Sequence, residues 1–256
     1  MNRRQRHNQI VSTVVERGLI EVGELASIYD VSQATIRRDL ETLEHQQLVS
    51  RTHGGARPHE AFNDMPLTYK RADNFAEKRA IAEEAAGYVD GALVIGMTGG
   101  TTVSEFARSL PHRSNLTVVT NALNIAIDLL QNQGLRVFVA GGEVRSSSEE
   151  AVGPSAEAFL SGYNIDVAFL GVDGVDPRAG CTNYDPIGAR VNRAMGERAK
   201  RVVVLADSTK IGRVTLAPVC AMSEVDVLIT DSGAPADAVE QFRAAGCQVV
   251  LVDVGA

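Results

Sequence analysis

The sequence has few of the features that mark exported, membrane-spanning or metal-binding proteins. Its only cysteines are Cys181, Cys220 and Cys247, an odd number without metal-site spacing, and its five histidines form no zinc pattern. No apolar run reaches the roughly 18–20 residues that span a bilayer, and no apolar stretch typical of a signal peptide follows the basic start. We therefore expect a soluble cytoplasmic protein with reduced thiols, no metal, no cofactor and no membrane partner.

Low-complexity bias and overall basic charge are also missing. With 45% hydrophobic and 22% charged residues, the 256-residue chain is long enough for one large domain or two modest ones. The net charge of −7 excludes a protein coated in basic surface. The first 57 residues nevertheless carry eight Arg, no Lys and seven acidic residues, so this segment is +1 and the remainder −8. Any nucleic-acid contact must come from a local cluster near the N-terminus.

The first 57 residues contain three helical patterns and a hairpin pattern. A first apolar face, made by Ile10, Val11, Val14 and Val15, stops at Gly18, a typical helix C-terminus, and a second short face follows. Ser32 is well placed as the N-cap of the third helix. Two runs joined by a Gly-Gly pair, residues 48–53 and 56–59, predict a hairpin. The outline is that of a winged helix-turn-helix. We expect the third helix to face the core with Ile36, Leu40 and Leu43.

The exposed face of the third helix carries residues suited to contact with DNA. Two adjacent arginines lie in the first turns of a helix that follows a short turn, as in a helix that enters the major groove. Arginine pairs with guanine or clamps a phosphate, although most exposed arginines are merely solvated. The predicted DNA contacts, with those of the hairpin included, are Ser32, Gln33, Thr35, Arg37, Arg38, Arg51 and His53.

From residue 74 onward, strand-like and helix-like runs alternate. Residues 58–73 show no clear period and predict a linker between residues 1–57 and 74–256. Continuous apolar strands separated by helices predict an α/β fold, with a Rossmann-like, mostly parallel sheet covered by helices on both faces. The expected strands are residues 92–97, 116–120, 135–140, 166–171, 202–206, 225–230 and 248–253. The expected helices are near residues 75–89, 101–110, 122–132, 153–161, 185–199 and 235–245.

Glycine-rich or polar corners follow five of the predicted strands. Because parallel strands end at one edge of a sheet, the corners predict one shared crevice. At the first corner, glycines admit an anion, and hydroxyls with helix N-terminal N–H groups bind it, although a tight turn also needs glycine. That corner is Gly99, Gly100, Thr101 and Thr102. The later corners supply Thr120, Asn121, Gly142, Asp173, Asp207 and Lys210.

The run "VSQATIRRDLETLE", followed by "LVSRTHGGA", resembles the signature of the DeoR family of bacterial transcriptional regulators. The resemblance continues through residues 75–231, where it includes the sugar-phosphate-isomerase-like fold that DeoR effector domains share with ribose-5-phosphate isomerase. It implies DNA contact by Arg37 and Arg38. It also implies phosphate or hydroxyl contacts by Lys78, Asp207 and Lys210, for each of which a surface salt bridge is the alternative.

A sensor and an enzyme are both compatible with this fold. Asp173 and Asp176 form a Gly-x-Asp-x-x-Asp motif similar to that of the isomerase, and a carboxylate pair can move a proton. The stretch that follows, "PRAGCTNYDP", has no Lys, glycine run or Glu, so the isomerase's catalytic set is incomplete. We therefore expect no catalytic residues and a ligand that is bound without turnover.

Together these patterns predict a transcriptional regulator, a repressor of a carbohydrate catabolism operon. It would bind double-stranded operator DNA as a homodimer or homotetramer and respond to a phosphorylated sugar or related effector. One alternative is a sugar-phosphate isomerase with an accessory DNA-binding domain, and another is a helix-turn-helix that contacts only proteins. Many sugar phosphates would present the same anion, so specificity would depend on side chains such as Arg145, Ser146, Tyr184 and Asp185.

Overall fold

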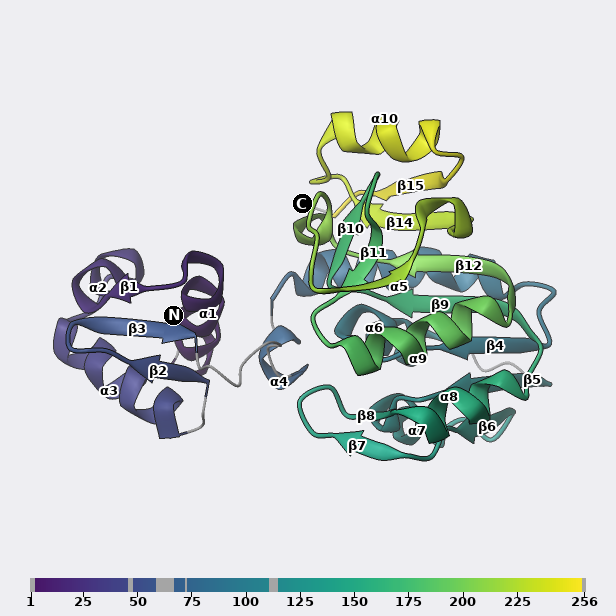
Figure 1. Ribbon diagram of the computed structural model, residues 1–256, viewed down its shortest axis with the longest axis horizontal. Coiled ribbons are helices and arrows are strands. Elements are labelled where there is room, and N and C mark those ends of the chain that lie inside the picture. The colour runs from purple at the N-terminus through teal and green to yellow at the C-terminus, as the bar shows by residue number, and fades with distance from the viewer. Residues whose placement is uncertain (1–2, 46–47, 59–66, 72, 111–114, 255–256) are drawn as a thin grey trace. The chain divides into compact units, whose positions relative to one another are not determined.

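In the computed structural model, the chain divides into two units, residues 1–73 and 74–256 (Figure 1). The structure describes residues 3–45, 48–58, 67–71, 73–110 and 115–254. Most of the predicted linker and the last residue of the predicted hairpin, His59, lie outside the described residues. The linker prediction overlooked a short helix, α4 (Leu67–Lys70), which is too brief to show a periodic pattern.

Within the first unit, residues 3–45 and 48–58 form three helices and a three-stranded sheet. The helices are α1 (Arg3–Arg17), α2 (Val22–Tyr29) and α3 (Gln33–His45), and the strands are β1 (Ile20–Glu21), β2 (Val49–Arg51) and β3 (Gly55–Pro58). The strands are antiparallel in the order β1-β3-β2. The predicted core residues Ile36, Leu40 and Leu43 are fully buried against α1 and α2 residues. The winged helix-turn-helix outline is therefore confirmed.

Two local features position elements of this fold: the start of α3 and the pairing of β3 with β1. The Ser32 Oγ accepts a hydrogen bond from the Thr35 N–H at 3.2 Å, which makes Ser32 the N-cap of α3 as predicted. Gly55 lies where β3 pairs with β1, and a Cβ there would overlap the carbonyl oxygen of Ile20. Only glycine lets the two backbones approach this closely.

A buried carboxylate ties α3 to α1. Asp39 is 2% exposed, and its Oδ2 accepts from Arg6 Nε at 2.7 Å while its Oδ1 lies 2.9 Å from His7 Nε2. Burial by itself raises the pKa of Asp39, but the hydrogen bonds and charges of Arg6 and His7 outweigh it and hold the pKa below its ordinary 3.8. The Asp39 carboxylate is therefore charged and links α3 to Arg6 and His7 of α1; we call it the charged fastener of the two helices.

The second unit contains a seven-stranded sheet in which every neighbouring pair is parallel. Its strands are β4 (Val94–Met97), β5 (Leu116–Thr120), β6 (Leu135–Val139), β9 (Ile165–Gly171), β12 (Ala199–Leu205), β14 (Val227–Asp231) and β15 (Gln248–Val252). Their order is β15-β14-β12-β9-β4-β5-β6. The chain thus builds outward from β4 in one direction and from β9 in the other, which places the topological switch point between these two strands.

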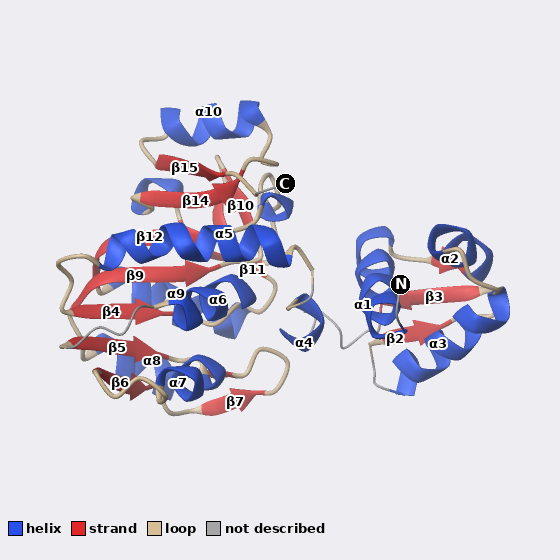
Figure 2. Cartoon of the chain, turned by 180° about the vertical axis from the view of Figure 1, so that it is seen from behind, coloured by secondary structure: helices blue, strands red, loops and turns tan. Residues whose placement is uncertain are grey.

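Helices cover both faces of this sheet. They are α5 (Phe75–Ala85), α6 (Thr101–Ser109), α7 (Leu123–Leu129), α8 (Pro154–Ser161), α9 (Pro186–Glu197) and α10 (Ala236–Ala244). The first three share one apolar core with the sheet and the last three share another. Figure 1 shows α8 and α9 in front of the sheet, and Figure 2, seen from behind, shows α5 and α6 in front. The predicted α/β architecture is therefore confirmed.

Several short elements were not predicted. A hairpin, β7 (Glu143–Arg145) with β8 (Glu150–Val152), follows β6, and a separate antiparallel sheet has the order β10-β11-β13. Its strands are β10 (Gly174–Asp176), β11 (Gly180–Asn183) and β13 (Ala217–Cys220). Three 3₁₀ turns complete the described elements: η1 (Ala86–Val89), η2 (Ser208–Lys210) and η3 (Met222–Glu224). Within the described ranges, no helix combines the length and the apolarity needed to traverse a bilayer.

Candidate functional site

One face of α3 is presented to solvent with its two arginines side by side. Arg37 and Arg38 are exposed, and Arg37 Nη2 donates to Gln33 Oε1 at 3.3 Å, one turn earlier. Ser32 and Thr35 also lie at the start of α3, where their hydroxyl oxygens are 2.9 Å apart and the cap uses part of their hydrogen-bonding capacity. The predicted set on this helix therefore shares one surface.

The hairpin of the first unit carries the remaining predicted DNA contacts. Arg51, on β2, and His53, in the turn after it, are both exposed. The Arg51 N–H donates to Glu44 Oε1 at 3.0 Å, and its Nη1 lies 3.8 Å from Glu44 Oε2. These exposed contacts join the hairpin to the end of α3, and the ion pair among them contributes little to stability.

The predicted anion corner lies at the switch point between β4 and β9. Gly100 has φ 121°, a conformation that favours glycine, and leads directly into α6. Gly171 ends β9, and a Cβ there would be 2.5 Å from the Gly99 carbonyl oxygen. Thr98 Oγ1 accepts from the Gly171 N–H at 2.9 Å and so joins the two strand ends. The glycines are therefore needed for close approach of two backbones, while Thr101 and Thr102 form the buried first turn of α6.

The end of β5 reaches the same corner through α7. The Asn124 Nδ2 donates to Ser104 Oγ at 2.8 Å, and that hydroxyl donates to the Gly100 carbonyl oxygen, also at 2.8 Å. Among the described residues, the buried acceptors Asn121 Oδ1 and Asn124 Oδ1 have no hydrogen-bond partner. Buried acceptors are normally paired, so these two oxygens suit the hydroxyl groups of a ligand. Thr120 serves the backbone instead, since its hydroxyl donates to Met97 O and accepts from Ala122 N.

A carboxylate from the β7–β8 hairpin lies in the corner. Glu150 Oε1 accepts from the Gly99 N–H at 3.0 Å and from Asn121 Nδ2 at 3.1 Å. A Cβ at Gly99 would overlap this carboxylate. The groups at Gly99 and Asn121 are thus arranged to hold an anion, and in this structure they hold one that belongs to the protein.

Asp207 and its neighbours form the other side of the predicted site, at the end of β12. Asp207 is 2% exposed, and its Oδ1 accepts from Thr209 N at 3.1 Å, from Thr209 Oγ1 and from Asn74 Nδ2 at 3.3 Å. Asn74 is the N-cap residue of α5. Lys78, one turn into α5, is only 4% exposed and is therefore a buried side chain. Lys210 is half-buried at the end of η2.

Other predicted residues lie near strand ends but take part in the backbone framework. Gly142 has φ 152°, and a Cβ there would be 2.8 Å from Val152 O, so this glycine permits β8 to pass. Asp173 Oδ2 accepts from the Tyr184 N–H at 3.2 Å, which holds the end of β9 to the strand end of β11. Of the four predicted specificity residues, Arg145 and Asp185 form an ion pair of 3.1 Å, Ser146 is exposed and Tyr184 is half-buried.

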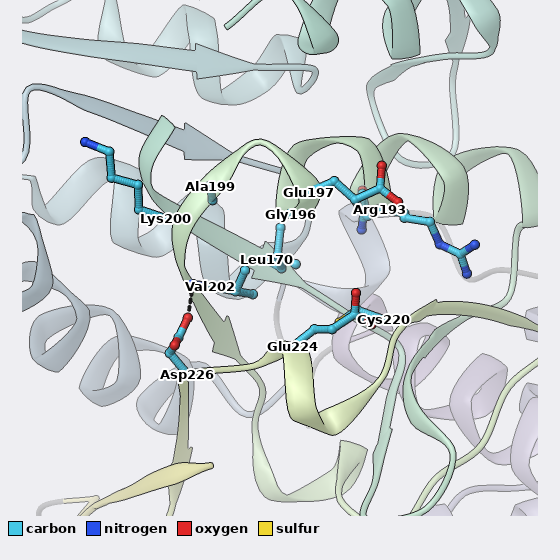
Figure 3. Close-up of a pocket in the computed structure, with 11 residues that line it drawn as sticks. Leu170, Arg193, Gly196, Glu197, Ala199, Lys200, Val202, Cys220, Glu224 and Asp226 are labelled. Atoms are coloured by element: carbon cyan, nitrogen blue, oxygen red, sulfur yellow. Dashed lines mark hydrogen bonds between the residues drawn. The ribbon is translucent and has the colours of Figure 1, made fainter. Parts of the chain in front are cut away.

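A cavity of about 260 Å³ lies elsewhere, where β12 begins and α9 ends (Figure 3). It is lined by polar and apolar residues from α9, β12, β13 and η3. Most of its charged side chains are already engaged by the fold: Arg193 donates to Val219 O, Lys200 to Asp166, and Glu224 and Asp226 accept from backbone N–H groups. The strand-end corner is the stronger candidate site because it combines anion donors with unpaired acceptors.

Sequence reasoning missed three residues of the candidate site: Glu150 and Asn124 at the corner, and Asn74 beside Asp207. Asn124 follows Asn121 by only three residues, which is a usable signal. Glu150 and Asn74 reach their partners from 29 and 133 residues away, respectively, and carry no local pattern. Both could be found only once the strand order was known.

The two units together define a class of protein: a winged helix-turn-helix DNA-binding head joined to a Rossmann-like sensor domain. Residues 6–61 match the model of the DeoR-like helix-turn-helix domain, and residues 73–232 match that of the DeoR C-terminal sensor domain. The chain therefore belongs to the DeoR family of transcriptional regulators.

Curated relatives match this chain along most of its length. The glycerol-3-phosphate regulon repressor of Escherichia coli strain K12 is 34% identical over 92% of this chain and 93% of its own. The transcriptional repressor AccR of Agrobacterium fabrum is 35% identical over 89% of each chain. These relatives are repressors, so the protein is a regulator, and the prediction that it is no enzyme is confirmed against the isomerase alternative.

Solved structures give a more distant likeness. Ribose 5-phosphate isomerase A from Methanocaldococcus jannaschii matches 52% of this chain with 21% identity and a TM-score of 0.40. The match spans about half of that chain, 53%.

Proposed function

We propose that this protein is a repressor of a carbohydrate catabolism operon that reads operator DNA through α3 and the β2–β3 wing. A phosphorylated sugar, bound at the strand ends around the Gly99 corner, would control it. In this proposal residues 1–57 are the DNA-binding head, 58–73 the linker and 74–256 the effector domain, and the protein acts in the cytoplasm as a homodimer or homotetramer. The observation that carries the proposal is the glycine corner at the switch point of the parallel sheet, directly before a helix N-terminus.

The DNA side of the proposal is supported by α3. Its inner face is fully buried, so its outer residues are held in fixed positions, and two adjacent arginines project into solvent from its first turns. A helix presented in this way suits the major groove, where arginine reads guanine or grips a phosphate. The exposed Arg51 and His53 of the wing suit the neighbouring backbone. Because a head of this kind reads one half-site, two heads are expected on each operator.

The effector side is supported by chemistry suited to a phosphorylated polyol. The corner offers N–H donors at Gly99 and the start of α6, where the helix dipole also favours an anion. The unpaired Asn121 and Asn124 oxygens suit sugar hydroxyls. Buried Lys78 and half-buried Lys210, on elements that meet around Asp207, are the cations proposed for the remaining contacts. The glycerol-3-phosphate regulon repressor has a name that points to the same class of effector.

The DNA test uses fluorescence anisotropy with DNA from the region upstream of the protein's own gene cluster. Replacing both Arg37 and Arg38 by Ala should weaken binding by about 2–6 kcal/mol, since each arginine contact with a base contributes roughly 1–3. The control is Arg79→Ala together with Arg243→Ala, which removes two exposed arginines of the other unit. Unchanged DNA binding by the Arg37/Arg38 variant would leave the head as a protein-contact module.

The effector test measures how a panel of sugar phosphates changes that DNA affinity. At least one of them should shift it, while the same sugars without phosphate should not. Gly100→Ala should remove the response but keep DNA binding, because φ 121° is strained for alanine and the corner's N–H groups must move. An effector response that survives in this variant would place the ligand away from the corner.

A further inference from the structure

The Gly99 corner holds a carboxylate that the chain itself supplies. Glu150 Oε1 accepts from both the Gly99 N–H and Asn121 Nδ2, and the carboxylate rests against the Cα of Gly99 where a side chain would otherwise lie. Both donors belong to residues in the proposed effector set. One oxygen thus takes two of the hydrogen bonds that an incoming phosphate would use.

The hairpin backbone around Glu150 is fastened independently of this contact. The Ala151 N–H donates to Asn121 O at 2.7 Å, and the Leu123 N–H donates to Glu149 O at 2.8 Å. The strand can therefore stay in place while the Glu150 side chain rotates away. The hairpin therefore does not need the contact between the Glu150 carboxylate and the Gly99 and Asn121 donors in order to fold.

We infer that Glu150 is an internal competitor for the effector site, a tethered carboxylate that a phosphoryl group must displace. This inference rests on the proposed function of the corner. A carboxylate and a phosphate dianion repel each other at this range, so the two cannot share the same donors. A neutral sugar lacks the charge to replace the carboxylate there. Glu150 consequently sets a threshold that selects phosphorylated ligands over unphosphorylated ones.

The test titrates the full-length protein with inorganic phosphate by isothermal titration calorimetry at constant ionic strength. Glu150→Gln keeps an acceptor for the two donors but removes the charge, and Glu150→Ala empties the position. Both should bind phosphate roughly tenfold more tightly than the unchanged protein, within the range of typical coupling between sites. The matched control is Glu143→Gln, which removes an exposed carboxylate from the other strand of the same hairpin and should leave the affinity unchanged.

The outcomes distinguish a failure of the competitor from a failure of the proposed anion site. Tighter binding by both Glu150 variants, with the control unchanged, supports the competitor. If the unchanged protein binds phosphate and Glu150→Gln binds it equally or less tightly, the competitor is overturned while the anion site stands. If neither the unchanged protein nor Glu150→Ala binds phosphate or any sugar phosphate, the anion site and the competitor both fail. Thermal melts that match the unchanged protein establish that the variants are folded.

Discussion

The DNA-binding head and the sheet domain are stabilised in different ways. The head has one small apolar core and adds a buried carboxylate, Asp39, that Arg6 and His7 hold from another helix. The sheet domain has two apolar cores, one on each face. Small units bury a smaller share of their surface. In the head, the charged network around Asp39 therefore contributes more to fixing the positions of the helices. The comparison predicts that the two units respond to different perturbations.

The largest effect is expected from an aromatic residue of the sheet core. Phe169 is fully buried and packs on Phe106 with ring centroids 4.4 Å apart. Phe169→Ala should cost the sheet domain about 3–5 kcal/mol through lost burial and a cavity. Hydrogen-exchange mass spectrometry should show faster exchange in peptides of β4, β9 and α6, with the head unchanged. The control is Phe75→Ala, at a half-exposed position on α5, and equal losses in head and sheet peptides would refute the separation.

A comparable test of the head removes its charged fastener. Asp39→Ala should destabilise the head by about 3 kcal/mol, because Arg6 and His7 lose a buried partner. The same exchange measurement should now show losses in α1 and α3 and none in the sheet strands. Glu41→Ala, which removes an exposed carboxylate from the same helix, is the matched control. Stability unaffected by the loss of Asp39 would mean that the apolar core alone fixes α3.

Acidification should act on the same fastener with a smaller effect, because it protonates Asp39 without removing it. The folded pKa of Asp39 lies below the ordinary 3.8, so its contribution to stability is complete above that value and is lost as the pH falls through the folded pKa. NMR signals of α3 amides should therefore report loosening of the head in acid. In Asp39→Asn this part of the pH dependence should be absent. An acid response that is the same in both proteins would assign it to other carboxylates.

The smallest effect is expected at the start of α3. Ser32→Ala removes the N-cap hydrogen bond to Thr35 and should cost the head about 1 kcal/mol, measured by urea unfolding followed through the same NMR signals. Ser27→Ala is the control, since the Ser27 hydroxyl donates back to Gly23 O within α2 and caps nothing. A cost at Ser32 no greater than at Ser27 would show that the cap is dispensable.

Much of the fold could be predicted from periodicity. The seven strands of the parallel sheet have four to seven mostly apolar residues, and helical patterns separate most of them, so each could be located to within a few residues. The strands that escaped prediction have only two to four residues, and some of them pair over long sequence distances, as β11 does with β13. A two-residue strand such as β1 has no period at all.

The site was predictable only in part, for the same physical reason. Gly99 and Gly100 can be recognised in the sequence because a tight turn between a strand and a helix needs glycine. Glu150 does not, because its role comes from a contact with residues 51 and 29 positions earlier. The partners of Asp39 likewise come from α1, more than 30 residues upstream.

The hydrogen bond from Asn74 to Asp207 has a mechanical consequence. Asn74 is the N-cap residue of α5, the first helix of the sheet domain, and Asp207 lies two residues after β12, more than 130 residues later. The point at which the chain enters the domain is therefore anchored at the edge where the strands end, not at the opposite edge. A displacement of Asp207 reaches this anchor through a single bond, without being relayed through the core of the sheet.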